Sequence, residues 1–150
     1  MRKIFIGADS AGFELKEELK AHLVSMGYEV IDCGTHSSES CHYPIFASQV
    51  CENVQKAPED TFGVLICGTG IGMSMCANKY NGIRAALCSD TFSARMTRMH
   101  NDANVICMGA RVIGSFLATD ILDIFLKSEF EGGRHKIRVD MMADIENSQK

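Results

Sequence analysis

The chain has 150 residues, which suits a single domain with a sizeable hydrophobic core. Its formal net charge of −4 and its hydrophobic content of 46% are ordinary for a globular protein and argue against a general nucleic-acid binder. No apolar stretch approaches the roughly 20 residues that a membrane-spanning helix needs, and the apolar run at the N-terminus is too short for a signal peptide.

Short apolar runs alternate with helical patterns along the chain. Lys3–Gly7 is expected to be the first strand, and leucines at helical spacing follow it as far as Gly27, a plausible helix stop. The other expected strands are Tyr28–Asp32, Phe62–Cys67, Ile83–Cys88 and Asn104–Met108. The other expected helices are the one that Pro44 opens, Met73–Lys79, Thr91–Met99, Val112–Leu126 and about Arg134 to Glu146. This alternation predicts a single-domain, Rossmann-like α/β/α sandwich over residues 1–150, with a five-stranded parallel sheet.

Seven cysteines occur in the chain, none of them in a Cys-x-x-Cys pair. An odd number of cysteines without a secretory signal is typical of reduced thiols in the cytoplasm rather than of a disulfide framework. Their spacing also lacks the two ligand pairs of a structural zinc site. We therefore expect a cytoplasmic protein that binds no metal.

The most informative stretch is Cys67-Gly68-Thr69-Gly70-Ile71-Gly72, which directly follows an apolar run. A strand, a glycine loop and a helix N-terminus together make an anion site, and they favour the thiolate form of Cys67. A base beside an anion site is what carbonyl chemistry through an enediolate needs. The loop fits neither nucleotide pattern, since no lysine follows until Lys79 and position 73 is Met. The simpler alternative is a tight connection with a buried cysteine.

In a parallel sheet, ligands bind beyond the carboxyl ends of the strands, at a topological switch point. The expected strands bring Asp9, Ser10 and the Cys67 loop to this edge. The loop over residues 33–43 follows the second strand and is expected to border the same pocket.

Basic residues near the C-terminus are a second candidate feature. Arg134 and Arg138 share one face of the last expected helix, and two guanidinium groups suit a phosphate, although a solvated basic face is the simpler alternative. His100 lies between an expected helix and an expected strand, where it is either an acid or base near neutral pH or plain surface. His135 should point about 100° away from Arg134 around the helix.

Ordered motifs over nearly the whole chain resemble the ribose-5-phosphate isomerase type B and galactose-6-phosphate isomerase family. The matching stretches are Gly7-Ala8-Asp9-x-Ala11-Gly12, Val30-Ile31-Asp32-x-Gly34-Thr35, Tyr43-Pro44, the loop Cys67–Gly72, Ala77-Asn78-Lys79, Gly82-Ile83-Arg84-Ala85, His100-Asn101-Asp102-Ala103-Asn104 and Gly132-Gly133-Arg134-His135. The resemblance implies an aldose–ketose isomerase of the pentose phosphate pathway that acts without a metal or organic cofactor. It also implies a homodimer, sometimes paired into tetramers, in which the partner completes each active site. The C-terminal helix, about residues 134–146, would pack at the dimer interface.

The resemblance also implies a role for each candidate residue. Cys67 would move a proton between C1 and C2, while His100 would help open the furanose ring with Thr69 as a supporting hydroxyl. The substrate-binding residues would be the backbone N–H groups of Gly68, Gly70, Ile71 and Gly72 for the enediolate oxygens, Asp9, Tyr43 and Asn101 for the sugar hydroxyls, and Arg111, Arg134 and Arg138 for the phosphate.

One position departs from the family pattern. The family commonly has Asp-His in the first loop, where this chain has Asp9-Ser10, and that histidine is thought to help bind the phosphate. Because serine is shorter and neutral, the contact would be lost, mediated by water, or replaced by another group such as His42 or His135.

The choice of substrate follows from the family motifs and leaves alternatives open. Cys67 and the intact His100-Asn101-Asp102 favour ribose 5-phosphate over galactose 6-phosphate, and allose 6-phosphate is a further alternative. A non-catalytic sugar-phosphate-binding module is an alternative from another class. The pair Cys67 and His100 favours the enzyme, because a binding module has no use for a base and a proton donor around one ligand.

Overall fold

The computed structural model describes residues 1–150 and contains one five-stranded sheet, in which every pair of neighbouring strands is parallel. The strands are β1 (Lys3–Ala8), β2 (Val30–Asp32), β3 (Thr61–Cys67), β4 (Ala85–Leu87) and β5 (Val105–Gly109). The helices are α1 (Phe13–Ser25), α2 (Tyr43–Lys56), α3 (Ile71–Ala77), α4 (Thr91–Asn101), α5 (Ser115–Lys127) and α6 (Arg134–Ser148). The predicted α/β/α sandwich with a parallel sheet is confirmed, and none of its helices is both long and apolar enough to cross a bilayer.

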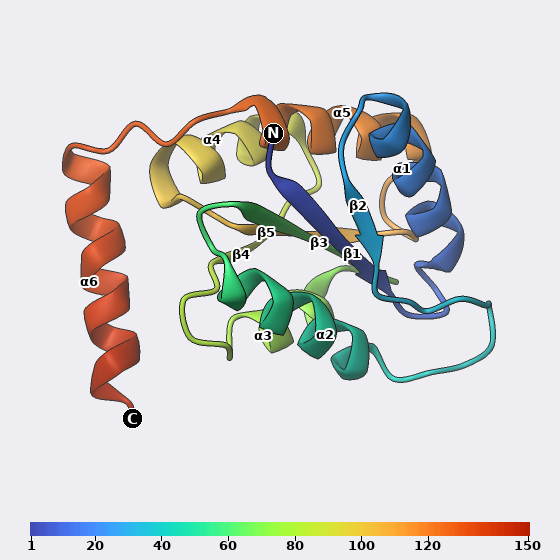
Figure 1. Ribbon diagram of the computed structural model, residues 1–150, viewed down its shortest axis with the longest axis horizontal. Coiled ribbons are helices and arrows are strands. Elements are labelled where there is room, and N and C mark those ends of the chain that lie inside the picture. Colours follow the sequence, from blue (N-terminus) through green and yellow to red (C-terminus); the bar gives the residue numbers. More distant parts are fainter.

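Helices cover both faces of the sheet, as Figure 1 shows. One hydrophobic cluster joins the sheet to α1, α4 and α5, and a second joins it to α2 and α3. The central strand β3 is buried along its whole length, which is why it appears in the sequence as an unbroken apolar run. Its side chains alternate between the faces, so that Ile66 belongs to the first cluster and Cys67 to the second.

The strand order β2-β1-β3-β5-β4 contains one reversal that matters for function. From β1 the chain goes outward to β2, and it then returns to the other side of β1 to form β3. The topological switch point therefore lies between β1 and β3, where ligands bind in open α/β sheets. β1 ends at Ala8 and β3 ends at Cys67, so Asp9 and the glycine loop both begin at this point.

Several predicted boundaries are wrong by two or three residues, and at two of them the backbone shows the local reason. Helix α3 begins at Ile71 rather than Met73, because Gly70 precedes it in the left-handed region with φ of 80°. Helix α4 continues to Asn101 and stops where Asp102 turns left-handed with φ of 49°, so His100 lies in a last helical turn and not in a loop. Strands β2 and β4 are shorter than expected, with three residues each. Helix α5 begins at Ser115, because Val112 and Ile113 form a turn in which both N–H groups donate to the Gly109 carbonyl.

Helix α6 stands apart from the rest of the molecule, beside the edge at which β4 and β5 begin (Figure 1). Only His135 and Val139 of this helix are buried. A cavity of about 780 Å³ lies between α6 and the segment around Gly82–Ala86, although Glu146 crosses it to accept a hydrogen bond from the Gly82 N–H over 3.0 Å. The helix thus leaves most of its apolar side chains exposed, namely Ile137, Met141, Met142 and Ile145.

Candidate active site

The thiol of Cys67 lies at the carboxyl end of β3, with only 5% of the residue exposed. Its Sγ accepts a hydrogen bond from the backbone N–H of Gly70 over 3.2 Å. Gly70 is in the left-handed region, and a Cβ there would collide with Leu87 and come within 2.9 Å of the Met108 carbonyl carbon. Only glycine fits this position, which keeps the N–H directed at the sulfur.

The rest of the glycine loop is held against the end of β5. The N–H of Ala110 donates to the Cys67 carbonyl over 2.9 Å, and the N–H of Arg111 donates to the Gly68 carbonyl over 3.0 Å. These bonds place the Arg111 side chain beside the loop, since a Cβ on Gly68 would lie 3.6 Å from its Nη1. The backbone N–H groups of Gly68 and Thr69 donate no hydrogen bond within the chain and are free to bind an anion.

Two other predicted residues contact this loop. The Thr69 hydroxyl accepts a hydrogen bond from the Ile71 N–H over 3.2 Å, which turns the chain into α3. The ring of Tyr43, in the first turn of α2, packs so closely on Gly72 that a Cβ there would lie 2.7 Å from the ring. The structure therefore brings Thr69, Ile71, Gly72 and Tyr43 to the same edge as Cys67.

Asp9 and Ser10 leave β1 directly beside the end of β3. Because Ala8 pairs with Ile66, Asp9 and Cys67 are the next residues on neighbouring strands, which run about 4.8 Å apart. The Asp9 carboxylate accepts the Gly12 N–H over 3.1 Å, while the Ser10 side chain makes no hydrogen bond in the structure. Of the three arginines predicted to bind the phosphate, only Arg111 lies at this edge.

A buried ion pair that sequence analysis missed fixes the loop after β2, next to this edge of the sheet. Lys16 is completely buried, and its Nζ donates to Asp32 Oδ2 at 2.6 Å, next to a bond of 2.9 Å from Lys20. Burial alone would raise the pKa of Asp32, but these bonds and one from the Gly34 N–H outweigh it and lower the pKa to about 2. Gly34 in turn bonds to Ala8 at the end of β1, so Asp32 fixes the loop that follows β2.

The remaining predicted residues lie at the opposite edge of the sheet. Helix α4 ends with His100 and Asn101, and the chain then enters β5, where the carbonyl of Asn104 accepts a hydrogen bond from Gly63 near the start of β3. From Gly63 to Cys67 the strand rises by roughly 13 Å. A single chain therefore does not bring His100 and Asn101 to the thiol of Cys67.

The three arginines predicted to bind the phosphate are likewise divided between the two edges of the sheet. Arg134 and Arg138 lie one turn apart on α6, both exposed, and neither side chain makes an ion pair or a hydrogen bond within the chain. Arg111 lies beside the Cys67 loop. One phosphate can meet all three arginines only if two copies of the chain contribute.

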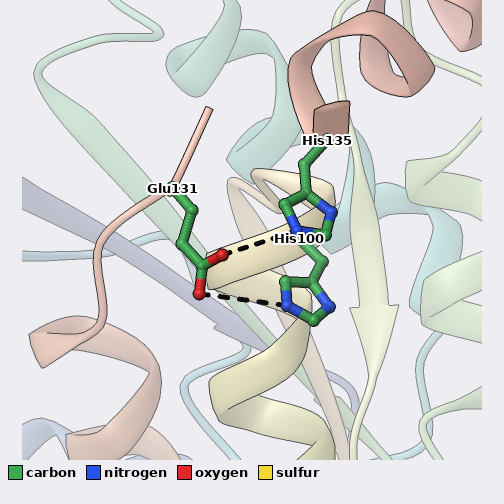
Figure 2. A group of neighbouring side chains, drawn as sticks. All are labelled: His100, Glu131 and His135. Carbon is green, nitrogen blue, oxygen red and sulfur yellow. Dashed lines mark ion pairs between the residues drawn. The ribbon is translucent and has the colours of Figure 1, made fainter. Parts of the chain in front are cut away.

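His100 belongs to a cluster with Glu131 and His135 (Figure 2). The two imidazole rings are stacked with centroids 4.0 Å apart and planes inclined by 6°. Glu131 faces both rings: its Oε2 lies 3.4 Å from His135 Nε2 and its Oε1 lies 4.0 Å from His100 Nε2. Burial lowers the pKa of His135, and the neighbouring His100 and Arg134 lower it further.

These three side chains are also the group in the structure that has the composition of a metal site, with ligand atoms within 4.8 Å of one another. The lone pairs of the stacked rings lie in nearly parallel planes, however, and a metal ion needs ligands that converge on it. One ring would have to turn before both nitrogens could bind the same ion. Sequence analysis did not connect His135 with His100. It named His135 only in the Gly-Gly-Arg-His motif and as a candidate replacement for the phosphate-binding histidine that Ser10 replaces.

A family model described as ribose/galactose isomerase matches residues 4–142, nearly the whole chain. The chain is a member of the ribose/galactose isomerase family. Its sequence is 52% identical to the Escherichia coli (strain K12) protein named ribose-5-phosphate isomerase B, over 97% of each chain. The family resemblance predicted from the motifs is therefore confirmed.

Solved structures of the family agree with the fold. A ribose-5-phosphate isomerase B from Clostridium thermocellum is 51% identical and superposes with a TM-score of 0.96, covering 99% of both chains. The Mycoplasma genitalium ribose-5-phosphate isomerase B, described with bound ribulose-5-phosphate, is 39% identical, covers 97% of this chain and 96% of its own, and has a TM-score of 0.94.

Proposed function

We propose that this family member is an aldose–ketose isomerase that interconverts ribose 5-phosphate and ribulose 5-phosphate. The observation that carries the proposal is the Cys67 thiol at the switch point, held by the Gly70 N–H beside the free N–H groups of Gly68 and Thr69. The near full-length identity of 52% to a ribose-5-phosphate isomerase B supports the choice of substrate.

The proposed reaction moves one proton between two carbons. The Cys67 thiolate takes the proton from C2 of the open-chain aldose, and the electron pair of the broken C–H bond forms the enediolate. The free N–H groups of the loop bind the oxygen on which negative charge develops. The thiol then returns the proton to C1, while the proton of the C2 hydroxyl passes to O1, so that C1 carries the hydroxyl and C2 the carbonyl of the ketose. Acid–base chemistry of this kind needs no cofactor.

We further propose that the active site is shared between two copies of the chain. Cys67, Asp9, Tyr43 and Arg111 lie at one edge of the sheet, and the residues expected to complete the site lie at the other, on α4 and α6. A two-fold dimer can place one edge of each copy against the opposite edge of the other. The apolar side chains exposed on α6 are of the kind that a partner covers.

The shared site is tested by combining two inactive variants. Cys67→Ala and His100→Asn are each expected to be inactive alone. Co-expressed with different tags, they form mixed dimers in which one of the two sites has both residues intact. Half of a random population is mixed, so about a quarter of the wild-type activity should return. If each chain contained a complete site, the purified mixture would stay inactive, and the proposed sharing would be wrong.

The substrate is tested by measuring turnover of ribose 5-phosphate, allose 6-phosphate and galactose 6-phosphate, each with and without a chelator. We expect the highest kcat/KM for ribose 5-phosphate and no effect of the chelator. A higher kcat/KM for either hexose phosphate would show that this sugar is the preferred substrate. Absence of turnover on all three sugars would favour the alternative that the protein is a non-catalytic sugar-phosphate-binding module.

The cytoplasmic location is a further part of the proposal. It rests on the seven cysteines, all of which are free thiols in the structure. Mass spectrometry of the protein isolated from its own cells under alkylating conditions should find every thiol labelled after denaturation. Disulfide-linked peptides would argue for an oxidising compartment.

A further inference from the structure

The contact between His100 and Glu131 links two segments that the sequence separates. The backbone N–H of Glu131 donates to the carbonyl of Met99 over 3.0 Å, which fixes the segment before α6 against the end of α4. The His135 N–H donates to the Gly132 carbonyl over 3.1 Å and starts α6 at that point. The three side chains in Figure 2 therefore come from two backbone segments that are hydrogen-bonded to each other, the end of α4 and residues 131–135.

The two histidines in this cluster are not equivalent. The His135 side chain is only 7% exposed, and its Nε2 is buried without a hydrogen-bond partner, since the nearby Glu131 oxygen lacks hydrogen-bond geometry. The His100 side chain, by contrast, is 37% exposed. Of the two rings, only that of His100 can both contact Glu131 and reach a substrate.

The charges around the cluster allow at most one of the two rings to become an imidazolium. Two stacked imidazolium rings would repel each other at a separation of 4.0 Å. Burial lowers the pKa of His135, the neighbouring His100, Arg134 and Arg138 lower it further, and Glu131 is the one anion that faces it. The ring that takes up a proton during the reaction is therefore the exposed ring of His100, whose Nε2 faces Glu131.

We propose that Glu131 and His135 are positioning residues for His100, with Glu131 holding its Nε2–H and His135 fixing the plane of its ring. This inference rests on the proposed function and assigns residues to its ring-opening step. The free nitrogen of His100 takes the proton of the anomeric hydroxyl, the C1–O4 bond breaks as the C1=O bond forms, and the imidazolium then gives a proton to O4. Glu131 stabilises the imidazolium between these two transfers, as a carboxylate does behind a catalytic histidine.

Ring opening can be measured separately from proton transfer between C1 and C2, because two reactions of ribose 5-phosphate and ribulose 5-phosphate differ in whether they need it. Turnover of ribose 5-phosphate starts from a ring and needs ring opening. Exchange of solvent deuterium into ribulose 5-phosphate needs only the Cys67 base, because a ketose phosphorylated on its 5-hydroxyl forms no furanose. A positioning residue for His100 affects the first reaction and leaves the second unchanged.

In Glu131→Gln we expect turnover of ribose 5-phosphate to fall by about threefold to thirtyfold, while deuterium exchange stays within about twofold of wild type. This loss is smaller than that for a general base itself because Glu131 is 42% exposed and 4.0 Å away.

Glu129→Gln is the matched control, because Glu129 is exposed on the same segment and has no ion pair in the structure. This variant should behave as wild type in both reactions. A similar loss in Glu129→Gln would show a general effect of charge on substrate attraction.

His135 is tested by a pair of variants. His135→Phe keeps a ring that can stack and should retain turnover within about threefold, whereas His135→Ala leaves the His100 ring unsupported and should lose more ring-opening turnover than deuterium exchange. Circular dichroism and the exchange reaction show whether each variant is folded.

The proposal is overturned if Glu131→Gln leaves both reactions unchanged, or if it slows both reactions equally. It is also overturned if His135→Phe and His135→Ala lose the same amount of turnover. A wild-type protein that catalyses neither reaction would instead overturn the proposed function itself.

Discussion

The backbone N–H of Gly70 donates a hydrogen bond to Sγ of Cys67 over 3.2 Å, within a loop of three glycines. The bond fixes the direction of a side chain that is otherwise buried among apolar residues of α2 and α3. The loop thus holds the proposed base of the reaction in place.

Replacement of Cys67 by alanine should remove most of the isomerase activity. We expect kcat to fall by about 10²–10⁴-fold or more, the usual loss for a general base, while ribulose 5-phosphate still binds in a calorimeter. Cys76→Ala is the control, because Cys76 lies nearby on α3 but does not contact the loop hydrogen bond. Near-normal turnover in Cys67→Ala would assign the base to another residue.

Replacement of Gly70 by alanine should damage both the fold and the thiol. The left-handed backbone costs alanine about 1–2 kcal/mol, and the clash with Leu87 and Met108 adds about 1–3 kcal/mol of overpacking. Gly82→Ala is the matched control: φ is 76° there, but nothing lies within 4 Å of the added Cβ. Urea unfolding should give a larger loss for Gly70→Ala, and mapping of alkylated peptides should show altered reactivity of Cys67 in that variant alone.

The glycine loop was predictable because its information is local. A buried strand, three alternating glycines and a following helix are adjacent in the sequence, and the parallel sheet then places Asp9 beside them. The same local reading misplaced the end of α4, because Asp102 adopts a left-handed conformation that non-glycine residues seldom use.

Contacts that depend on tertiary packing were not predictable. His100 and His135 stack only because the segment between α5 and α6 returns to the end of α4 through the bond from Glu131 to Met99. Lys16 looks like a surface residue of an amphipathic helix, yet it is fully buried because Asp32, from the end of β2, compensates its charge. No residue spacing in the sequence predicts either of these contacts.

The ion pair between Asp32 and Lys16 should make the free energy of unfolding depend on pH in the acid range. The pKa of Asp32 is about 2 in the folded protein and near 3.8 when the chain unfolds, so folding favours the ionised form. This stabilisation is fully present above pH 3.8 and is lost as the pH falls toward 2. A shift of this size corresponds to about 2 kcal/mol of unfolding free energy.

Asp32→Asn should therefore destabilise the protein by about 2–4 kcal/mol at pH 7, since Lys16 loses its shortest partner and keeps only Glu17. The difference in unfolding free energy from wild type should shrink between pH 4 and pH 2, as measured by urea unfolding in both proteins. Asp140→Asn removes an exposed pair with Lys136 and should cost less than about 1 kcal/mol. A pH-independent loss in Asp32→Asn would mean that packing, not charge, explains the effect.

The two arginines of α6 should bind the phosphate of the substrate. Arg134 and Arg138 are exposed and unpaired, and hydrogen bonds to a charged group contribute about 1.5–3 kcal/mol each. Arg138→Ala should therefore raise KM for ribose 5-phosphate by roughly 10- to 100-fold, with about 1.4 kcal/mol for each factor of ten. The slow turnover of unphosphorylated ribose should barely change, because that sugar has no dianion to lose.

Two further variants distinguish phosphate binding from support of the fold. Lys136→Ala removes a cation from the same helix that is already paired with Asp140, and its KM for ribose 5-phosphate should stay near wild type. Ser10→His adds an imidazole where the present side chain has no hydrogen bond, and it should lower KM for ribose 5-phosphate if the pocket beside Asp9 faces the phosphate. An equal rise of KM for ribose and ribose 5-phosphate in Arg138→Ala would show that this arginine supports the helix or its partner contacts instead.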